Sequence, residues 1–212
     1  MIQENKAKRE DILSKAVHAC ARKYDRDGTC YPHEVQVSAL SELLFDNMHS
    51  LFPTYSKEER DMLAYAALLH DTGTFVNRNG HHKISYNIIC GEGLEIGFFD
   101  GETQLVALIA RYHRKAVPST KNIHYAELSS EKQKKVRILS ALLRIADGLD
   151  YTHDQIITDI DCTINESHII CRCTGDARHL ATSESTVLCN LDRAREKSEP
   201  FTQEFGKQLI YV

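Results

Sequence analysis

The stretch Leu68-Leu69-His70-Asp71-Thr72-Gly73 places an adjacent histidine and aspartate at the end of an apolar segment that begins at Met62. Successive residues of a helix point about 100° apart, so the two side chains can reach one point only where the helix ends at Thr72-Gly73. An imidazole and a carboxylate are both ligands for divalent transition metals, and a carboxylate has a second oxygen that can bridge a second ion. The structural alternative is that His70 caps the helix and Asp71 begins a turn. The rest of the chain has to decide between these two interpretations.

The composition is that of an ordinary globular protein. The chain has 212 residues, of which 42% are hydrophobic and 26% are charged, and this predicts one domain or one domain with an appendage. The formal net charge of -4 argues against a general nucleic-acid binder, whose surface is usually basic. No apolar run approaches the roughly 18 residues that a membrane helix needs. The first ten residues are polar and lack the apolar core of a signal peptide, so we expect a cytoplasmic protein.

Apolar residues recur at helical spacing through most of the chain before residue 150. Ser56 and Glu59 predict a capping box at the start of the helix that leads to His70. Gly91 and Gly93 are expected to end the helix that follows. The predicted helices cover about residues 6–24, 32–49, 56–69, 82–93, 102–112 and 136–147.

The pattern changes after His153. Residues 156–164 and 168–173 alternate between apolar and polar and predict a pair of strands, whereas residues 184–205 return to helical spacing and 208–212 predict a last strand. We therefore expect a mainly α fold, with a helical domain over residues 1–155 and a small α+β appendage over residues 156–212. The appendage is expected to cover an apolar face or to form a subunit contact, and not to reach the candidate site.

The candidate ligands share one position in the predicted helices, because each lies at or beside a helix terminus. A site built at one end of a helical bundle requires this arrangement, since facing helices supply its ligands. His81 is expected to be a neighbour of the site, and His153 is expected in a loop. The candidate ligands are His33, His70, Asp71, His82, His113 and Asp147.

The order H…HD…H…H…D resembles the HD superfamily of metal-dependent phosphohydrolases over roughly residues 14–154. The matching segments are Ala67-Leu68-Leu69-His70-Asp71-Thr72-Gly73, His82-Lys83-Ile84-Ser85-Tyr86, Tyr112-His113-Arg114 and Leu143-Arg144-Ile145-Ala146-Asp147-Gly148-Leu149-Asp150. The segments 81–86, 110–115 and 142–150 also look like the C-terminal HD domain of exopolyphosphatase and guanosine pentaphosphate phosphohydrolase proteins. Those enzymes do their known chemistry in two actin-like N-terminal domains without counterpart in this sequence, so that activity is not carried over.

The resemblance implies an HD-domain helical bundle that binds two divalent metal ions, drawn from Mn, Fe, Zn, Ni or Mg. The minimal set of such a domain, matching His33, His70, Asp71 and Asp147, holds a single ion, and His82 and His113 are the additional ligands that a second ion requires. Asp71 would bridge the two ions as the catalytic residue. Lys83, Arg114 and Arg144 are the expected contacts to substrate phosphate. Arg144 is included because it lies one helical turn before Asp147, on the same face.

We therefore expect a metal-dependent phosphohydrolase that acts on a phosphate ester or phosphoanhydride of a small nucleotide or polyphosphate-like substrate. The alternative is a non-catalytic regulatory module that binds polyphosphate or a nucleotide without turnover. The sequence predicts no membrane partner, and it leaves open whether the chain forms a homo-oligomer.

Overall fold

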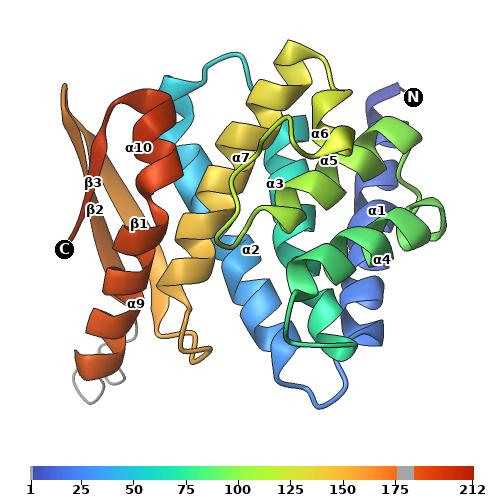
Figure 1. Cartoon of the computed structure of the whole chain (residues 1–212), viewed down its shortest axis with the longest axis horizontal. Helices are drawn as coiled ribbons and strands as arrows, with labels where there is room; N and C mark the ends of the chain where they lie inside the picture. The colour runs from blue at the N-terminus through green and yellow to red at the C-terminus, as the bar shows by residue number, and fades with distance from the viewer. Residues whose placement is uncertain (1, 176–183) are drawn as a thin grey trace.

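The computed structural model describes residues 2–175 and 184–212, which form a bundle of helices with a small sheet on one side (Figure 1). The prediction of a mainly α fold with a small α+β part is confirmed. The longer helices are α1 (Ile2–Lys23), α2 (Cys30–Met48), α3 (Lys57–Leu69), α4 (His81–Ile96), α5 (Asp100–Arg111), α7 (Ser130–Leu149) and α9 (Glu184–Lys197). The shorter ones are η1 (His49–Leu51), η2 (Thr72–Phe75), α6 (Ile123–Ala126) and α10 (Glu199–Phe205), and none of the described helices is both long and apolar enough to cross a membrane.

Helix α7 is the central helix of the bundle, and it packs against α2, α3, α5, α9 and α10. Every residue from Ile138 to Leu149 is buried, including the charged side chains of Arg144 and Asp147. Burying charged groups is costly unless they are paired. The C-terminal half of α7, where Arg144 and Asp147 are buried among apolar residues, is therefore a place where the protein has to supply partners.

Helix α3 begins with the predicted capping box. Glu59 Oε2 accepts a hydrogen bond from the Ser56 backbone N–H at 2.7 Å, and Ser56 Oγ accepts one from the Glu58 N–H at 3.2 Å. These bonds satisfy donors that the first turn of a helix leaves without intrahelical partners. The helix then runs through an apolar segment and ends at Leu69, so His70 follows directly as its C-cap.

Helix α4 does not end at the two glycines where the sequence suggested. It continues through Gly91 and Gly93 to Ile96 and ends at Gly97, whose φ of +97° is a left-handed conformation that suits glycine. A Cβ atom on Gly93 would lie 2.4 Å from Cγ2 of Thr103. The glycine therefore permits the close packing of α4 on α5 and does not terminate the helix.

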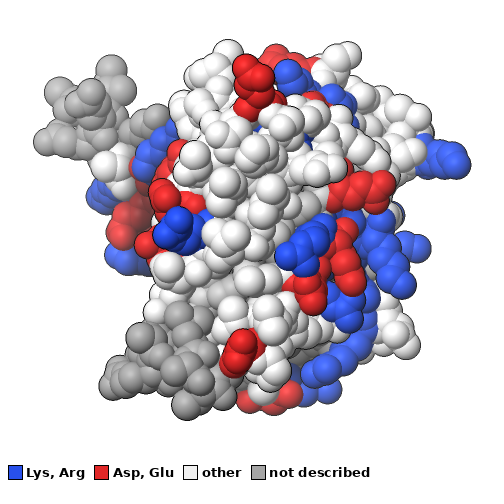
Figure 2. Space-filling model, turned by 90° about the vertical axis from the view of Figure 1, so that its left-hand side faces the viewer, with Lys and Arg blue, Asp and Glu red and all other residues white. Residues whose placement is uncertain are grey.

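The sheet has the strand order β1-β2-β3, with β1 (Ile157–Ile164) antiparallel to β2 (His168–Gly175) and β3 (Gln208–Tyr211) parallel to β2. Its buried side chains, such as Ile160 and Cys171, join the same apolar core as the bundle. Strand β1 packs on α2, and α9 packs on α7. Figure 2 shows the side of the molecule where the sheet lies, and a band of uncharged side chains runs through the middle of that face. The domain boundary at residue 155 stays a prediction.

Candidate metal centre

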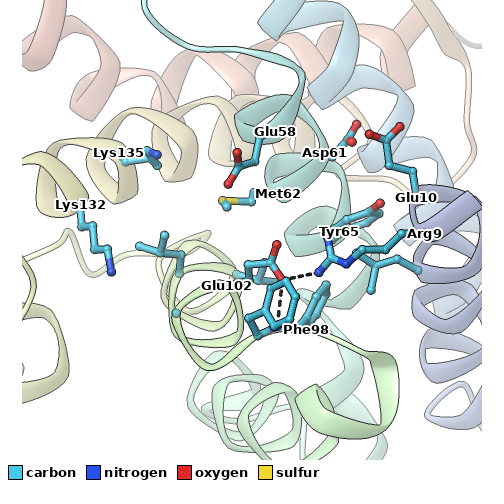
Figure 3. Close-up of a pocket in the computed structure, with 15 residues that line it drawn as sticks. Arg9, Glu10, Glu58, Asp61, Met62, Tyr65, Phe98, Glu102, Lys132 and Lys135 are labelled. Atoms are coloured by element: carbon cyan, nitrogen blue, oxygen red, sulfur yellow. Dashed lines mark hydrogen bonds and ion pairs between the residues drawn. The ribbon is translucent and has the colours of Figure 1, made fainter. Parts of the chain in front are cut away.

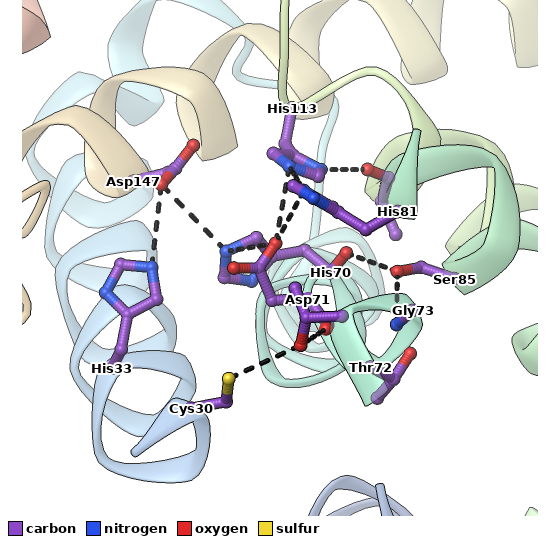
Figure 4. Close-up of polar contacts among 12 residues, drawn as sticks. Cys30, His33, His70, Asp71, Thr72, Gly73, His81, Ser85, His113 and Asp147 are labelled. Atoms are coloured by element: carbon purple, nitrogen blue, oxygen red, sulfur yellow. Dashed lines mark hydrogen bonds and ion pairs between the residues drawn. The ribbon is translucent and has the colours of Figure 1, made fainter. Parts of the chain in front are cut away.

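Six buried histidine and aspartate side chains meet where the C-terminal ends of α3, α5 and α7 lie beside the N-terminal ends of α2 and α4 (Figure 4). Their ligand atoms form three overlapping groups, and within each group these atoms lie within 4.8 Å of one another. The groups are His33, His70 and Asp71; His70, His113 and Asp147; and Asp71, His81 and His113.

Gly73 explains why α4 begins so close to the His70-Asp71 pair. A Cβ atom at this position would lie 2.3 Å from the His81 carbonyl oxygen and 2.6 Å from the Ser85 backbone nitrogen. Ser85 fixes the contact, because its Oγ donates to the His70 carbonyl oxygen at 2.6 Å and accepts from the Gly73 N–H at 2.9 Å. The glycine therefore permits the approach that brings His81 to Asp71.

Each of the four histidines has its Nδ1 atom bonded to an oxygen that can only accept a hydrogen bond. Nδ1 therefore donates, and the Nε2 lone pair is left for the centre of the cluster. This outer hydrogen bond is the usual way in which proteins orient a metal-binding imidazole. The acceptors are Asp150 Oδ2 for His33 (2.8 Å), Ala67 O for His70 (2.6 Å), Arg78 O for His81 (2.9 Å) and Ala110 O for His113 (2.7 Å).

The ligand atoms that face the centre of the cluster lie close together, and several of them make no hydrogen bond with another described residue. His81 Nε2 lies 3.0 Å from His113 Nε2 and 3.0 Å from Asp71 Oδ1. Two imidazole lone pairs at that separation repel one another unless a proton or a cation lies between them. His33 Nε2, His70 Nε2 and Asp71 Oδ1 are buried and have no hydrogen-bond partner in the described part of the chain. Unpartnered buried ligand atoms on several residues fit a bound cation.

The electrostatics favour ionised carboxylates. Burial alone raises the pKa of Asp71, but His70, His81 and His113 outweigh it and hold the pKa well below its usual range. Asp147 behaves in the same way, because Lys197 and the neighbouring histidines outweigh the effect of burial on its pKa.

The histidines of the cluster divide into two kinds. Burial lowers the pKa of His70 and of His113, which favours the neutral form of these two imidazoles. Burial also lowers the pKa of His33, but the adjacent carboxylates of Asp147 and Asp150 raise it overall to about 10. Ionised carboxylates and neutral imidazoles are the forms that bind metals, and a metal ion has to displace the proton from His33.

The structure brings His81 into the candidate groups of ligand atoms and leaves its neighbour His82 outside them. His81, which was expected to be a neighbour, lies in the cluster. His82, which was expected to be a ligand, points elsewhere because it lies about 100° further around the helix. Its ring centroid is 6.5 Å from that of His113, and it lines a separate cavity. The sequence HH offered no signal that distinguishes the two positions.

The three cationic residues expected to contact phosphate lie in different places. Arg114 lines both cavities that open onto the cluster. Arg144 lines one of them, but its Nη1 donates to the carbonyl oxygens of Tyr112 and Ala116 at 3.2 Å each. Lys83 lines the separate cavity beside His82. Arg114 is therefore the expected phosphate residue with the most direct access to the cluster.

The C-terminal part of the chain reaches the site, contrary to expectation. Lys197, in the last turn of α9, donates a hydrogen bond to Asp147 Oδ2. Arg193 and Glu196 of the same helix line the cavity above the cluster. No pattern in the sequence predicts this contact, because a lysine fifty residues after Asp147 resembles any other basic residue of a surface helix.

Asp150 and His153 support the cluster from the turn after α7. Asp150 is 1% exposed and accepts the Nδ1 hydrogen bond of His33. The ring of His153 stacks on that of His33, with centroids 3.7 Å apart and planes 4° from parallel. His153 has a φ of +59°, which is uncommon for a residue with a side chain. His153, expected in a loop, thus lies in the loop but also covers a candidate ligand.

Two adjoining cavities of about 810 Å³ and 420 Å³ open onto the cluster, and Asp71, His81, Arg114 and His153 line both of them. A further cavity of about 500 Å³ lies at the opposite ends of α3, α5 and α7. Figure 3 shows the ion pair between Arg9 and Glu102 that borders it, with 2.8 Å between Nη2 and Oε2. None of the cluster residues lines this third cavity.

Residues 12–195 match the family model of the Ppx/GppA phosphatase, domain III. The match includes all six residues of the buried cluster and most of α9, so it covers both the site and the helix that closes over it. The chain belongs to the family of Ppx/GppA phosphatase domain III proteins.

Proposed function

We propose that this protein is a metal-dependent phosphohydrolase of the HD superfamily that acts on a small, highly phosphorylated substrate. The observation that carries the proposal is a set of buried ligand atoms that face one centre and make no hydrogen bond with a described residue, namely His33 Nε2, His70 Nε2 and Asp71 Oδ1. The Nδ1 hydrogen bonds of the histidines turn their Nε2 atoms toward the same centre. The phosphatase family of the chain supports a phosphorylated ligand.

The donor set suits two divalent ions. His33, His70, Asp71 and Asp147 would hold one ion, and Asp71, His81 and His113 would hold the second. Asp71 belongs to both sets, so its carboxylate would be the bridge. Imidazole-rich ligation with carboxylates suits Mn, Fe, Zn or Ni, whereas Mg prefers oxygen ligands.

Metal ions in such a site would lower the pKa of a bound water and polarise the phosphoryl oxygens. The chain itself would position the substrate. Arg114 and Lys115 follow the C-terminus of α5, and Arg193 and Lys197 lie on α9; all four line the cavity of about 420 Å³ above the cluster. Arginine forms bidentate contacts with phosphate, and lysine supplies a point charge. These cations would bind the phosphates that do not react.

The test begins with elemental analysis of protein purified without added metal. The apoprotein is then reconstituted with each candidate ion and assayed against phosphomonoesters, phosphodiesters, nucleoside triphosphates and tripolyphosphate. We expect metal-dependent turnover of at least one class, and Asp71→Asn should abolish both stoichiometric metal binding and turnover. Absence of metal binding to the wild-type protein would refute the proposal.

The alternative function is a binding module that recognises a polyphosphorylated ligand without turnover. It is favoured by Lys197, which supplies a positive charge to Asp147 from within the chain, and by the description of the matching family as one domain of a phosphatase. Ligand binding by metal-loaded protein with no turnover in the substrate panel would establish this alternative.

A further inference from the structure

A separate cavity of about 440 Å³ lies behind His82, on the side of α4 that faces away from the cluster. It is bounded by the start of α4, the end of α5, the segment after α5 and the start of α6. The residues that line it are His82, Lys83, Arg111, Tyr112, Ala116, Val117, Ser119, Lys121, Asn122 and Ile123. None of the six cluster residues is among them.

The cavity behind His82 is lined by positively charged side chains that no acidic residue in the described part of its wall neutralises. Lys83, Arg111 and Lys121 line it, and none of the described residues in its wall is acidic. None of these three cations forms an ion pair with a residue in the described parts of the chain; the Arg111 guanidinium lies over the ring of Tyr86 instead, 5.3 Å from the centroid. Three unpaired cations around one hollow create a positive potential that attracts an anion.

The remaining wall offers neutral polar groups and an apolar edge. Ser119 and Asn122 contribute polar side chains, whereas Val117 and Ile123 are 48% and 63% exposed. Exposed β-branched side chains beside cations suit a ligand that combines phosphate groups with a flat organic ring. The cavity therefore has the features expected of a site for a phosphorylated small molecule.

The segment between residues 112 and 116 separates this cavity from the metal centre. Tyr112 and Ala116 line the cavity behind His82, whereas His113, Arg114 and Lys115 line the cavity above the cluster. The partition is held from within the bundle by the hydrogen bonds from Arg144 Nη1 to the carbonyl oxygens of Tyr112 and Ala116. A ligand bound behind His82 would contact no candidate metal ligand.

We propose that the cavity behind His82 is a second, metal-independent binding site for the phosphate chain of a polyphosphorylated small molecule. Lys83, Arg111 and Lys121 bind the phosphates. Val117 and Ile123 contact the organic part where the ligand has one. This site is distinct from the proposed catalytic centre, and it holds whether or not the centre is catalytic.

The test uses the full chain stripped of metal and kept in EDTA, so that the cluster cannot contribute a metal-bound phosphate. Isothermal titration with tripolyphosphate and with ATP measures binding at low ionic strength. We expect both to bind, and Lys83→Gln with Lys121→Gln should weaken both roughly tenfold or more, because two charge-assisted contacts are lost. Both lysines are exposed, so the double variant should fold like the wild type, which circular dichroism verifies.

Two control variants test whether the ligand binds behind His82 or at the metal centre. Lys115→Gln removes an equally exposed lysine on the metal side of the partition and should leave the affinity within about twofold. Asp71→Asn should also leave it unchanged. Loss of binding in either control, with the double variant unaffected, would assign the ligand to the metal centre and overturn the proposal, as would no binding of tripolyphosphate to the wild type. A higher affinity for ATP than for tripolyphosphate would support the role of Val117 and Ile123.

Discussion

Lys197 holds one oxygen of Asp147 while the other oxygen faces the histidine cluster. The ammonium group donates to Oδ2, and Oδ1 lies 3.5 Å from His33 Nε2 and 4.0 Å from His70 Nε2. The side chains of Lys197 and Asp147 are 21% and 12% exposed, so water screens the pair only in part. The helix at the C-terminal end of the chain therefore fixes the orientation of a candidate metal ligand on the central helix.

Lys197→Met should destabilise the metal-free protein more than the metal-loaded protein. Without the lysine, a partly buried carboxylate loses its cation, which should lower the free energy of unfolding by about 1–3 kcal/mol. A bound divalent ion would neutralise Asp147 and recover most of that loss. Thermal unfolding with and without metal measures the difference.

Arg195→Met is the matched control, because it removes an exposed ion pair from the same helix. Exposed pairs contribute at most about 1 kcal/mol, and metal should not change the effect of this variant. An equal loss of stability for Lys197→Met in both metal states would show that Lys197 has a purely structural role.

His81→Ala and His82→Ala should differ sharply, although the two residues are adjacent. His81 lies 3.0 Å from both Asp71 Oδ1 and His113 Nε2, so its loss should lower metal content and abolish metal-dependent turnover. His82 is in none of the candidate metal-binding groups, so its loss should leave metal content unchanged. Elemental analysis of the two purified variants decides the assignment. The reverse result would restore the prediction from sequence.

The sequence predicted the positions that depend on local pattern. Helical spacing located α3 and α7, the Ser56 and Glu59 signature located the start of α3, and alternation located the strands. His33, His70, Asp71, His113 and Asp147 were predicted to meet because each closes or opens a predicted helix, and the structure brings them together. Whether they bind metal stays a prediction.

The features that the sequence does not predict depend on the direction in which side chains leave a helix and on tertiary packing. The choice between His81 and His82 depends on which face of α4 packs toward the cluster, because adjacent positions of a helix point about 100° apart. The contact of Lys197 with Asp147 depends on how α9 packs on α7. Gly93 resembles a helix end in the sequence, whereas its actual role depends on the packing of Thr103 from another helix, which the sequence does not reveal.

Arg144 and Arg114 should separate structural from substrate-binding roles. Arg144 is 8% exposed, and its Nη1 bonds the carbonyl oxygens of Tyr112 and Ala116, so Arg144→Ala should lower the free energy of unfolding by about 1–3 kcal/mol. Arg114 makes no ion pair or hydrogen bond with a described residue through its side chain and lines both cavities at the cluster. Arg114→Ala should therefore leave stability within about 0.5 kcal/mol and raise KM roughly tenfold.

Denaturant unfolding and steady-state kinetics on the two arginine variants provide the measurements. Metal content should stay at the wild-type level in both, because neither residue belongs to a candidate ligand group. An Arg144→Ala variant that unfolds with the wild-type free energy but has a raised KM would indicate that Arg144 binds substrate phosphate. Its position one turn before Asp147 predicts that role.

Glu59 makes the stability of the protein depend on acid pH. Its Oε1 accepts from Lys135 Nζ at 2.6 Å, and its Oε2 accepts from the Ser56 N–H at 2.7 Å and from Ser56 Oγ at 2.8 Å. Burial raises the pKa of Glu59, but these partners outweigh it and lower the pKa below its usual value of 4.5. The folded state thus favours the ionised carboxylate, and the stabilisation is present above pH 4.5 and is lost as the pH falls through the lower folded pKa.

Glu59→Gln should therefore lower the free energy of unfolding by about 1–2 kcal/mol at pH 7, because it removes the charge from a capping box and from its pair with Lys135. The difference from the wild type should shrink as the pH falls below 4.5, since the wild-type carboxylate then becomes protonated as well. Glu58→Gln, one residue away and exposed, should change stability by no more than about 0.5 kcal/mol at any pH. Urea unfolding of the three proteins between pH 3.5 and pH 7 measures the effect. A constant difference across that range would show that Glu59 stabilises α3 through its hydrogen bonds alone and that its charge contributes nothing.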